Sequence, residues 1–178
     1  CPIQLRIIDQ AYTSTAFIIP GGFIYIYKDL LNALQSEAQL TAVLSHLILS
    51  SRNRISIPKL KERFTNNFII DLADGGNLDV DINLVIHELK EVAYDSSLVS
   101  IADVETENTV CELGYDIQSY SDMFNHEASK NLQWFHLFPR NHNQYASYLF
   151  STVNNYPQCL DQEIDGELEY HHFKQTLN

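Results

Sequence analysis

One stretch of this chain, residues 36–54, constrains the fold most because it encodes a buried helix together with its start. Ser36 precedes Gln39 by three residues, the spacing of a capping box, in which each side chain accepts a hydrogen bond from a backbone N–H at the helix start. The apolar residues that follow recur at helical spacing and widen into a broad face: Leu40, Val43, Leu44, Leu47, Ile48 and Leu49. A helix that is apolar on most sides lies inside a domain, so we expect the rest of the chain to pack around it.

The residues before this helix predict a small β-sheet. Residues 3–9 alternate and then run apolar, which is typical of a strand. Residues 16–27 contain two extended pieces with a Pro-Gly-Gly bend at 20–22. Aromatic residues and isoleucines alternate over 23–27, so we expect them to lie on opposite faces of a strand. Residues 28–34 predict a short helix that leads into the central one.

The remaining chain predicts further helices. Residues 83–112 read as two helical segments, and residues 119–138 and 143–154 carry apolar and aromatic residues at helical spacing. The expected fold class is therefore α+β and mostly helical, with a small N-terminal sheet packed on a central buried helix. We expect one domain over residues 1–160 and an acidic C-terminal tail over residues 161–178.

Composition limits the possible partners. With 178 residues, 45% hydrophobic and 19% charged, the chain is long and apolar enough for a single globular core. No apolar run approaches the roughly 20 residues of a membrane-spanning helix. The net charge of −12 disfavours nucleic acid and anionic membrane surfaces as partners, because both would repel this protein.

The cysteines leave the redox compartment open. Their number, three, excludes a fully paired framework within one chain. Cys111 and Cys159 could form one disulfide, although two buried thiols are the simpler expectation. Cys1 could be the lipid-bearing residue of an exported lipoprotein. A trimmed chain is favoured over this reading, because residues 2–8 already look like the first strand of the domain. The compartment therefore stays open, with an extracytoplasmic location, periplasmic or lipid-anchored, preferred to the cytoplasm.

Several short motifs follow one another in a distinctive order. Residues 16–22 read Ala-Phe-Ile-Ile-Pro-Gly-Gly, His46 lies in the central helix, and Ala-Asp at 102–103 precedes Gly-Tyr-Asp at 114–116. This series resembles the zinc metallopeptidases of the HtpX and CaaX-prenyl-protease type, which are gluzincins. In that family an Asn-Ala-Phe-x-x-Pro-Gly-Gly strand leads to a His-Glu-x-x-His helix, and Glu-x-x-Ala-Asp and Gly-Tyr-Asp follow.

The resemblance implies a cleft between the Pro-Gly-Gly edge strand and the central helix. In active relatives this edge strand pairs with an extended substrate by strand addition. The matching positions here, our candidates for a peptide groove, are Pro20, Gly21, Gly22 and Phe23.

The same resemblance implies a degenerate metal site. In the family two histidines and a later glutamate hold zinc, and the glutamate beside the first histidine is the general base. Here the first histidine is kept as His46, the base position is Leu47, the second histidine position is Ser50, and the third-ligand position is Val99. Leucine cannot accept a proton and valine cannot bind a metal. We therefore expect no catalytic residue and no metal cofactor, with His46 as a vestige.

Three functions remain open. The first is a catalytically degenerate pseudopeptidase that binds a protein or an extended peptide. The alternative is an active zinc metalloendopeptidase with displaced ligands, in which His46 is joined by His87, Glu88 or a later histidine; His87 to Glu91 reads His-Glu-x-x-Glu, which an exposed charged helix face also explains. The third is a structural or regulatory domain whose cleft binds nothing, as expected if the side chains at Leu47 and Val99 fill the groove.

Overall fold

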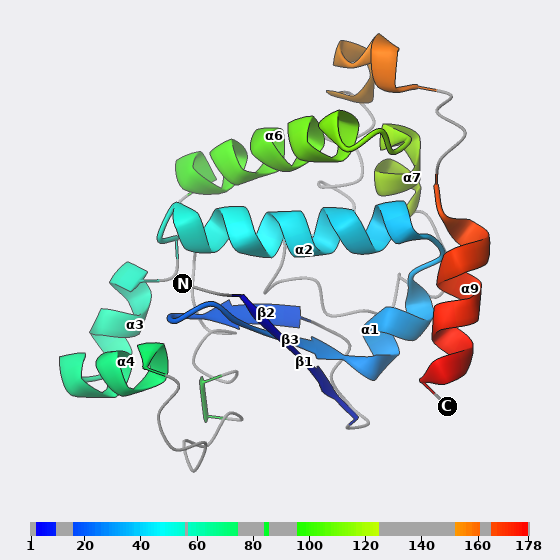
Figure 1. Ribbon diagram of the computed structural model, residues 1–178. Helices are drawn as coiled ribbons and strands as arrows, with labels where there is room; N and C mark the ends of the chain where they lie inside the picture. Colours follow the sequence, from blue (N-terminus) through cyan, green and yellow to red (C-terminus); the bar gives the residue numbers. More distant parts are fainter. Residues whose placement is uncertain are drawn as a thin grey trace.

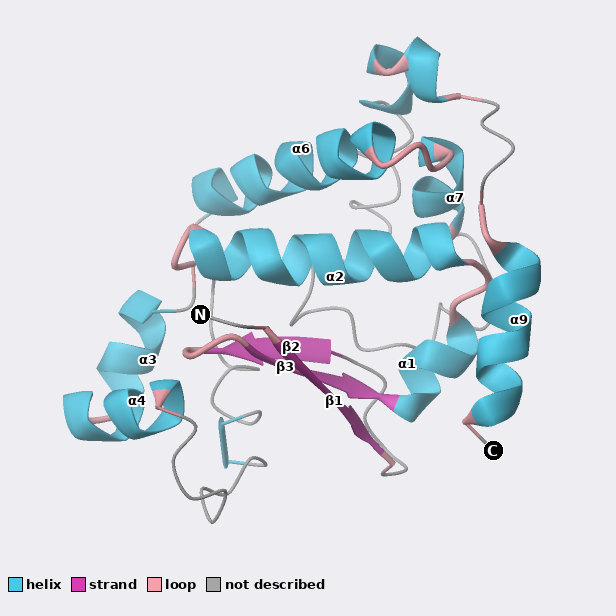
Figure 2. Ribbon diagram, viewed as in Figure 1, coloured by secondary structure: helices cyan, strands magenta, loops and turns pink. Residues whose placement is uncertain are grey.

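The computed structural model describes residues 3–9, 16–55, 57–74, 84–85, 96–124, 152–160 and 165–177. Within these residues the long helix α2 (Glu37–Arg52) lies between a three-stranded sheet on one side and helix α6 (Ser96–Glu112) on the other (Figure 1). This layered arrangement of helices and one small sheet confirms the mostly helical α+β class (Figure 2). It also confirms that the sheet packs on the central helix.

The sheet contains the strands that the alternating pattern predicted. Strand β3 (Phe23–Tyr27) is central, with β1 (Gln4–Ile8) parallel to it on one side and β2 (Ala16–Ile19) antiparallel on the other. Gly21 and Gly22 between β2 and β3 have φ angles of 95° and 84°, a region that favours glycine. This glycine pair explains why the chain can reverse so tightly there.

The described helices, in chain order, are α1 (Lys28–Ala33), α2 (Glu37–Arg52), α3 (Ile57–Arg63), α4 (Asn66–Ala73), α6 (Ser96–Glu112), α7 (Ile117–Asp122), the 3₁₀ helices η3 (Val153–Asn155) and η4 (Pro157–Cys159), and α9 (Glu167–Thr176). Helix α6 is followed by Gly114, whose φ of 83° is the left-handed conformation common just after a helix end. The helices predicted over 125–138 and 143–151 lie outside the described residues.

Helix α2 begins as its sequence predicted. The Ser36 hydroxyl accepts a hydrogen bond from the Gln39 amide at 3.3 Å. The Gln39 side-chain oxygen accepts one from the amide of Gln35 at 2.8 Å, one residue earlier than in the standard capping box. Both side chains therefore satisfy backbone donors at the helix start, as expected.

The two faces of β3 pack in different parts of the core. Ile24 and Ile26 face α2 and join its apolar side chains in the main cluster. Phe23, Tyr25 and Tyr27 face the other way, toward α3 and α4, in a second cluster with Leu60, Ile69, Leu72 and Val85. Strand β3 is thus covered on both faces, as its continuous apolar sequence requires, whereas Leu5 and Ile7 of the edge strand β1 are 50% and 46% exposed.

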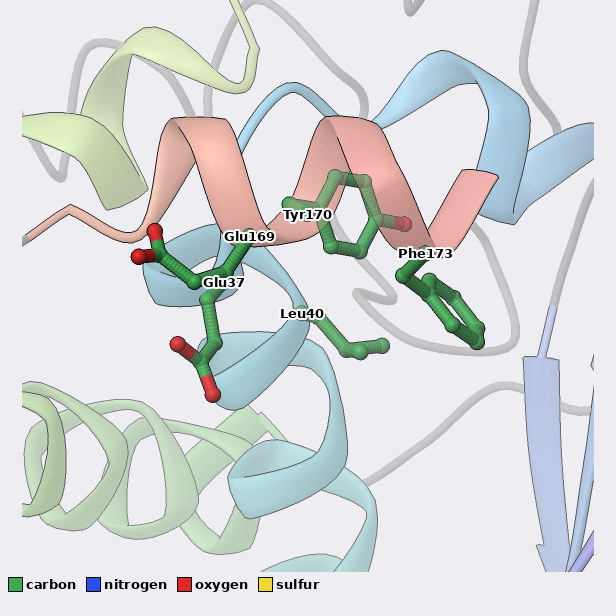
Figure 3. Close-up of a pocket in the computed structure, with 5 residues that line it drawn as sticks. All are labelled: Glu37, Leu40, Glu169, Tyr170 and Phe173. Carbon is green, nitrogen blue, oxygen red and sulfur yellow. The ribbon is translucent and has the colours of Figure 1, made fainter. Parts of the chain in front are cut away.

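The C-terminal helix α9 packs onto this core. Tyr170 is 2% exposed and belongs to the main cluster. Its hydroxyl donates a hydrogen bond of 2.7 Å to the backbone carbonyl of Leu31. Figure 3 shows Tyr170 and Phe173 of α9 beside Leu40 of α2. Part of the segment predicted to be an acidic tail, residues 161–178, therefore contributes to the core through α9.

Candidate functional site

The positions that the sequence singled out lie on two adjacent helices. His46, Leu47 and Ser50 are on the second half of α2, and Val99 is near the start of α6. These helices run side by side along most of their length (Figure 1). The structure therefore places the four positions in the same part of the fold.

His46 is buried beside a carboxylate of α6. Its side chain is 2% exposed, and its Nδ1 atom lies 3.6 Å from Oδ1 of Asp103, which is fully buried. This distance is within ion-pair range for a protonated imidazole but longer than a normal hydrogen bond. The imidazole is thus held in the interface between α2 and α6.

The other three positions supply no metal ligand of the family kind. Leu47 is 2% exposed and belongs to the main apolar cluster. Ser50 is partly buried, and Val99 is a helical residue of α6. A leucine and a valine have no lone pair to offer, and a serine hydroxyl is a poor zinc ligand. The residues present therefore do not fit a zinc ion of the family type.

Within the described residues, no three His, Cys, Asp or Glu side chains converge as a metal site would require. His87, Glu88 and Glu91, the candidates for a relocated site, lie outside these residues.

A second buried carboxylate, which the sequence reasoning missed, lies one helical turn beyond Asp103. Glu107 is 1% exposed, and its Oε1 accepts a hydrogen bond of 2.7 Å from the hydroxyl of Thr152. Burial raises the pKa of Glu107 and the charge of Asp103 acts in the same direction, whereas hydrogen bonds from Thr152 and Tyr156 oppose the rise. The spacing of Asp103 and Glu107, four residues apart on one helix face, was the available signal.

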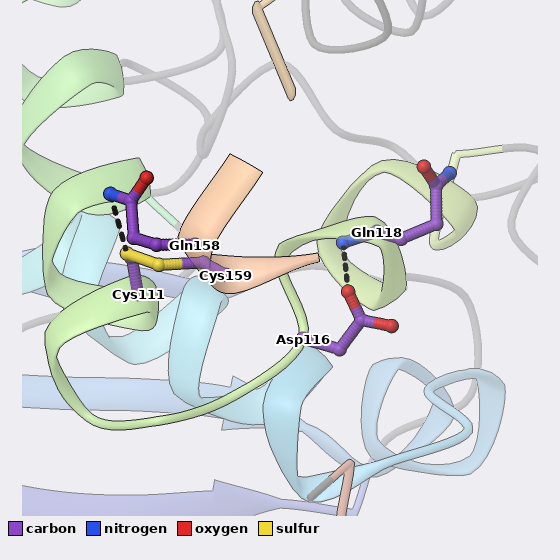
Figure 4. The surroundings of a disulfide bond; sticks show 5 residues. All are labelled: Cys111, Asp116, Gln118, Gln158 and Cys159. Atoms are coloured by element: carbon purple, nitrogen blue, oxygen red, sulfur yellow. Dashed lines mark hydrogen bonds between the residues drawn. A yellow bond between two sulfur atoms is a disulfide. The ribbon is translucent and has the colours of Figure 1, made fainter. Parts of the chain in front are cut away.

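A disulfide attaches the segment that carries Thr152 to α6. Cys111 and Cys159 are joined with their Cα atoms 5.4 Å apart (Figure 4), a normal separation for a bridge. The expectation of two buried thiols was wrong, because η4 brings Cys159 onto the last turn of α6. Nearby, Asp116 accepts a hydrogen bond from the amide of Gln118 and so caps α7 (Figure 4).

An open groove of about 600 Å³ lies at the C-terminal end of α2. It is lined by Ile3, Ile18, Gly21, Gly22, Ile48, Ser51, Arg52 and Ala73. These residues come from β2, the turn after it, the segment before β1, and the ends of α2 and α4. The groove thus lies between the Pro-Gly-Gly turn and the central helix.

The predicted groove residues divide into two groups. Gly21 and Gly22 line the groove. Phe23 is 8% exposed and packs instead with Tyr25 in the second core cluster on the other face of the sheet. Pro20 is partly buried in the turn. The groove is therefore built from the glycines and from isoleucines that the sequence reasoning did not select.

Arg52 has a fixed position at the rim of this groove. Its guanidinium pairs with the carboxylate of Glu105 on α6, which also accepts a hydrogen bond of 3.0 Å from the side chain of Asn53. Leu47, one turn earlier on α2, points into the core. The side chain at the position that the resemblance assigns to the base therefore does not fill the groove.

Among the described helices, none is both long and apolar enough to cross a membrane.

Part of the chain matches a known protein family. The family model of Peptidase family M48 matches residues 2–48. The match covers the sheet, α1 and α2 as far as Ile48, so it includes His46 and ends before Ser50. No curated protein matches the chain. The metallopeptidase-like relationship predicted from the sequence is thus confirmed over residues 2–48.

Proposed function

We propose that this chain is a catalytically degenerate, metallopeptidase-like domain that binds an extended peptide segment of a protein partner. The observation that carries the proposal is the open groove beside the Pro-Gly-Gly turn. A domain whose cleft binds nothing would be expected to fill this space, and Leu47 lies in the core instead.

The chemistry of the groove favours an extended peptide with apolar side chains. Ile3, Ile18 and Ile48 give it apolar walls. Among the described residues β2 is an edge strand that pairs with β3, and an edge strand is the position at which strand addition occurs. In such complexes backbone hydrogen bonds give affinity, and pockets for alternate side chains give specificity.

The loss of catalysis is supported by the residues at the former metal site. A zinc peptidase needs three ligands and a positioned base. Leu47 and Val99 supply neither, and His46 is buried against Asp103. The alternative, an active peptidase with displaced ligands, is an outcome of the test below.

We also propose an extracytoplasmic location. The disulfide between Cys111 and Cys159 supports it, because such bonds persist mainly in oxidising compartments.

Binding is tested by NMR titration of ¹⁵N-labelled protein with an acetylated peptide that alternates leucine and serine. We expect saturable shifts at the amides of Ile18, Gly21 and Ile48. Ile48→Glu, at an exposed position of the groove wall, should weaken binding at least about fivefold, because it places a charge where an apolar side chain docks. Ile101→Glu, at an exposed isoleucine on α6 outside the groove lining, is the control; Ile101 is 49% exposed and Ile48 is 36% exposed.

Catalysis is tested separately by elemental analysis of the purified protein after dialysis against zinc. We expect zinc well below one equivalent and no thermal shift. A tightly held equivalent of zinc together with peptide cleavage would contradict the degenerate assignment. Absence of saturable binding to the groove, or equal effects of the two isoleucine variants, would contradict peptide binding.

A further inference from the structure

A second pocket lies at the opposite end of α2, between that helix and α9. Its volume is about 280 Å³, and it is lined by Glu37, Leu40, Glu169, Tyr170 and Phe173. Leu40 and Ser51, which line the two sites, are eleven residues apart on α2, or about 16 Å along the helix axis at about 1.5 Å per residue. The pocket is therefore separate from the peptide groove.

The pocket is apolar on one side and acidic on the other. Figure 3 shows Leu40, Tyr170 and Phe173 at one end and the carboxylates of Glu37 and Glu169 at the other. The Tyr170 hydroxyl donates its hydrogen bond to the Leu31 carbonyl, so the part of this residue that lines the pocket is its ring. A ligand must therefore match an apolar surface beside two carboxylates.

Local contacts hold the acidic end in place. The Ala38 amide donates a 3.0 Å hydrogen bond to the Asp165 carbonyl, which joins the start of α2 to the segment before α9. Gly166 has a φ of 67° and lies so close to Glu37 that a Cβ atom there would collide with the Glu37 side chain. The Tyr115 hydroxyl also donates to Glu37, and burial chiefly raises the pKa of this tyrosine. Gly166 and Tyr115 thus contact the Glu37 side chain from two sides.

Within the described part of the chain, no basic side chain forms an ion pair with either carboxylate. Lys174, on the same helix as Glu169, donates instead to the backbone carbonyls of Asn32 and Leu34. Its Nζ also lies 5.5 Å from the centre of the Tyr170 ring. Among the described residues, a ligand would therefore meet the two carboxylates without a competing ion pair. The protein's net charge of −12 also attracts cations over longer distances.

We propose that this pocket binds an alkylammonium group, the chemistry shared by a lysine side chain and a small aliphatic amine. The aliphatic stem packs on Leu40 and Phe173, and the ammonium lies between Glu37 and Glu169. The volume holds roughly nine water molecules at about 30 Å³ each. This size suits one such chain, and not a nucleotide or a folded partner.

The probe is n-hexylammonium chloride, titrated at low ionic strength into ¹⁵N-labelled protein. We expect saturable shifts at the amides of Leu40, Tyr170 and Phe173. Affinity should rise from ethylammonium to hexylammonium by about twofold to fourfold per methylene that becomes buried. Hexanol, which has the same stem without the charge, should bind more weakly. Added salt should weaken the binding of hexylammonium but not the binding of hexanol, because salt screens only the charged interaction.

The carboxylates are tested by the double variant Glu37→Gln with Glu169→Gln. It should reduce hexylammonium affinity about threefold to thirtyfold, because two ion pairs at exposed carboxylates are lost. The matched control is Glu112→Gln with Asp71→Asn, which removes the same charge from exposed positions away from the pocket. It should keep the affinity within about twofold.

The source of the ammonium group is distinguished by a second arm with N-acetyl-lysine methylamide. Binding as tight as that of hexylammonium identifies a lysine of a partner protein, and much weaker binding identifies a free amine. Equal binding of hexanol and hexylammonium would overturn the proposal. Lack of saturation, or equal loss in the two double variants, would overturn it as well. None of these results depends on the peptide groove.

Discussion

Removal of the disulfide should cost the protein a large part of its stability. Cys111 and Cys159 are separated by 48 residues. Closing a loop of this length lowers the entropy of the unfolded chain enough to stabilise the fold by about 4 kcal/mol in the chain-entropy model. The melting temperature of a domain of this length falls by about 2–4 °C for each kcal/mol of stability lost. The double variant Cys111→Ala with Cys159→Ala should therefore melt about 8–16 °C lower than the wild type.

The assay is urea unfolding followed by circular dichroism, in a Cys1→Ala background that removes thiol exchange. The oxidised protein is compared with the same protein under a reducing agent and with the double variant. The reduced protein and the double variant should each lose about 4 kcal/mol of unfolding free energy relative to the oxidised protein. Amide exchange at Thr152 and Cys159 should accelerate most, because these residues are joined to α6 by the disulfide and the Glu107 contact. A thiol titration that finds Cys111 and Cys159 free without reductant, or a loss below about 1 kcal/mol, would refute the reasoning.

Three further predictions concern single residues. Glu107→Gln should remove a pH dependence of stability. Wild-type stability should fall as pH rises above 4.5 through the raised folded-state pKa of Glu107, because the unfolded glutamate releases its proton first. In urea unfolding at pH 4 and pH 7, the variant should therefore gain stability relative to wild type as pH increases. Ser36→Ala should cost about 1 kcal/mol by thermal unfolding, because the Gln39 amide loses its cap, whereas an equal cost at Ser51→Ala would contradict this origin. Gly21→Ala should cost more than about 1 kcal/mol, because φ is 95° and the new Cβ would meet the Ala73 carbonyl; unchanged stability would be the contrary result.

The sequence predicted the first part of the fold well because local rules determine it. The cap at Ser36 and the apolar spacing after it defined α2, and the Pro-Gly-Gly bend divided β2 from β3. Each of these features depends on residues only a few positions apart. They lie within the segment that the M48 family model matches.

Contacts between distant residues could not be predicted in the same way. Thr152 lies 45 residues from Glu107, and nothing local indicates that its hydroxyl reaches the carboxylate. The disulfide is also a distant contact, which is why two thiols were expected instead. Phe23 was assigned to the groove with its turn, but the register of β3 places it on the opposite face. The groove isoleucines come from several elements, and their convergence is a property of the tertiary fold.

The hydrogen bond between Tyr170 and the carbonyl of Leu31 has a consequence for synthesis. The two residues are 139 positions apart. At about 5–20 residues per second, Leu31 leaves the peptidyl-transferase centre about 7–28 s before Tyr170 is made. Once α1 and α2 have left the ribosome, their apolar surface that α9 later covers stays exposed on the nascent chain until α9 is made. Chaperones that bind such surfaces therefore have several seconds in which to engage this protein before it can close its own core.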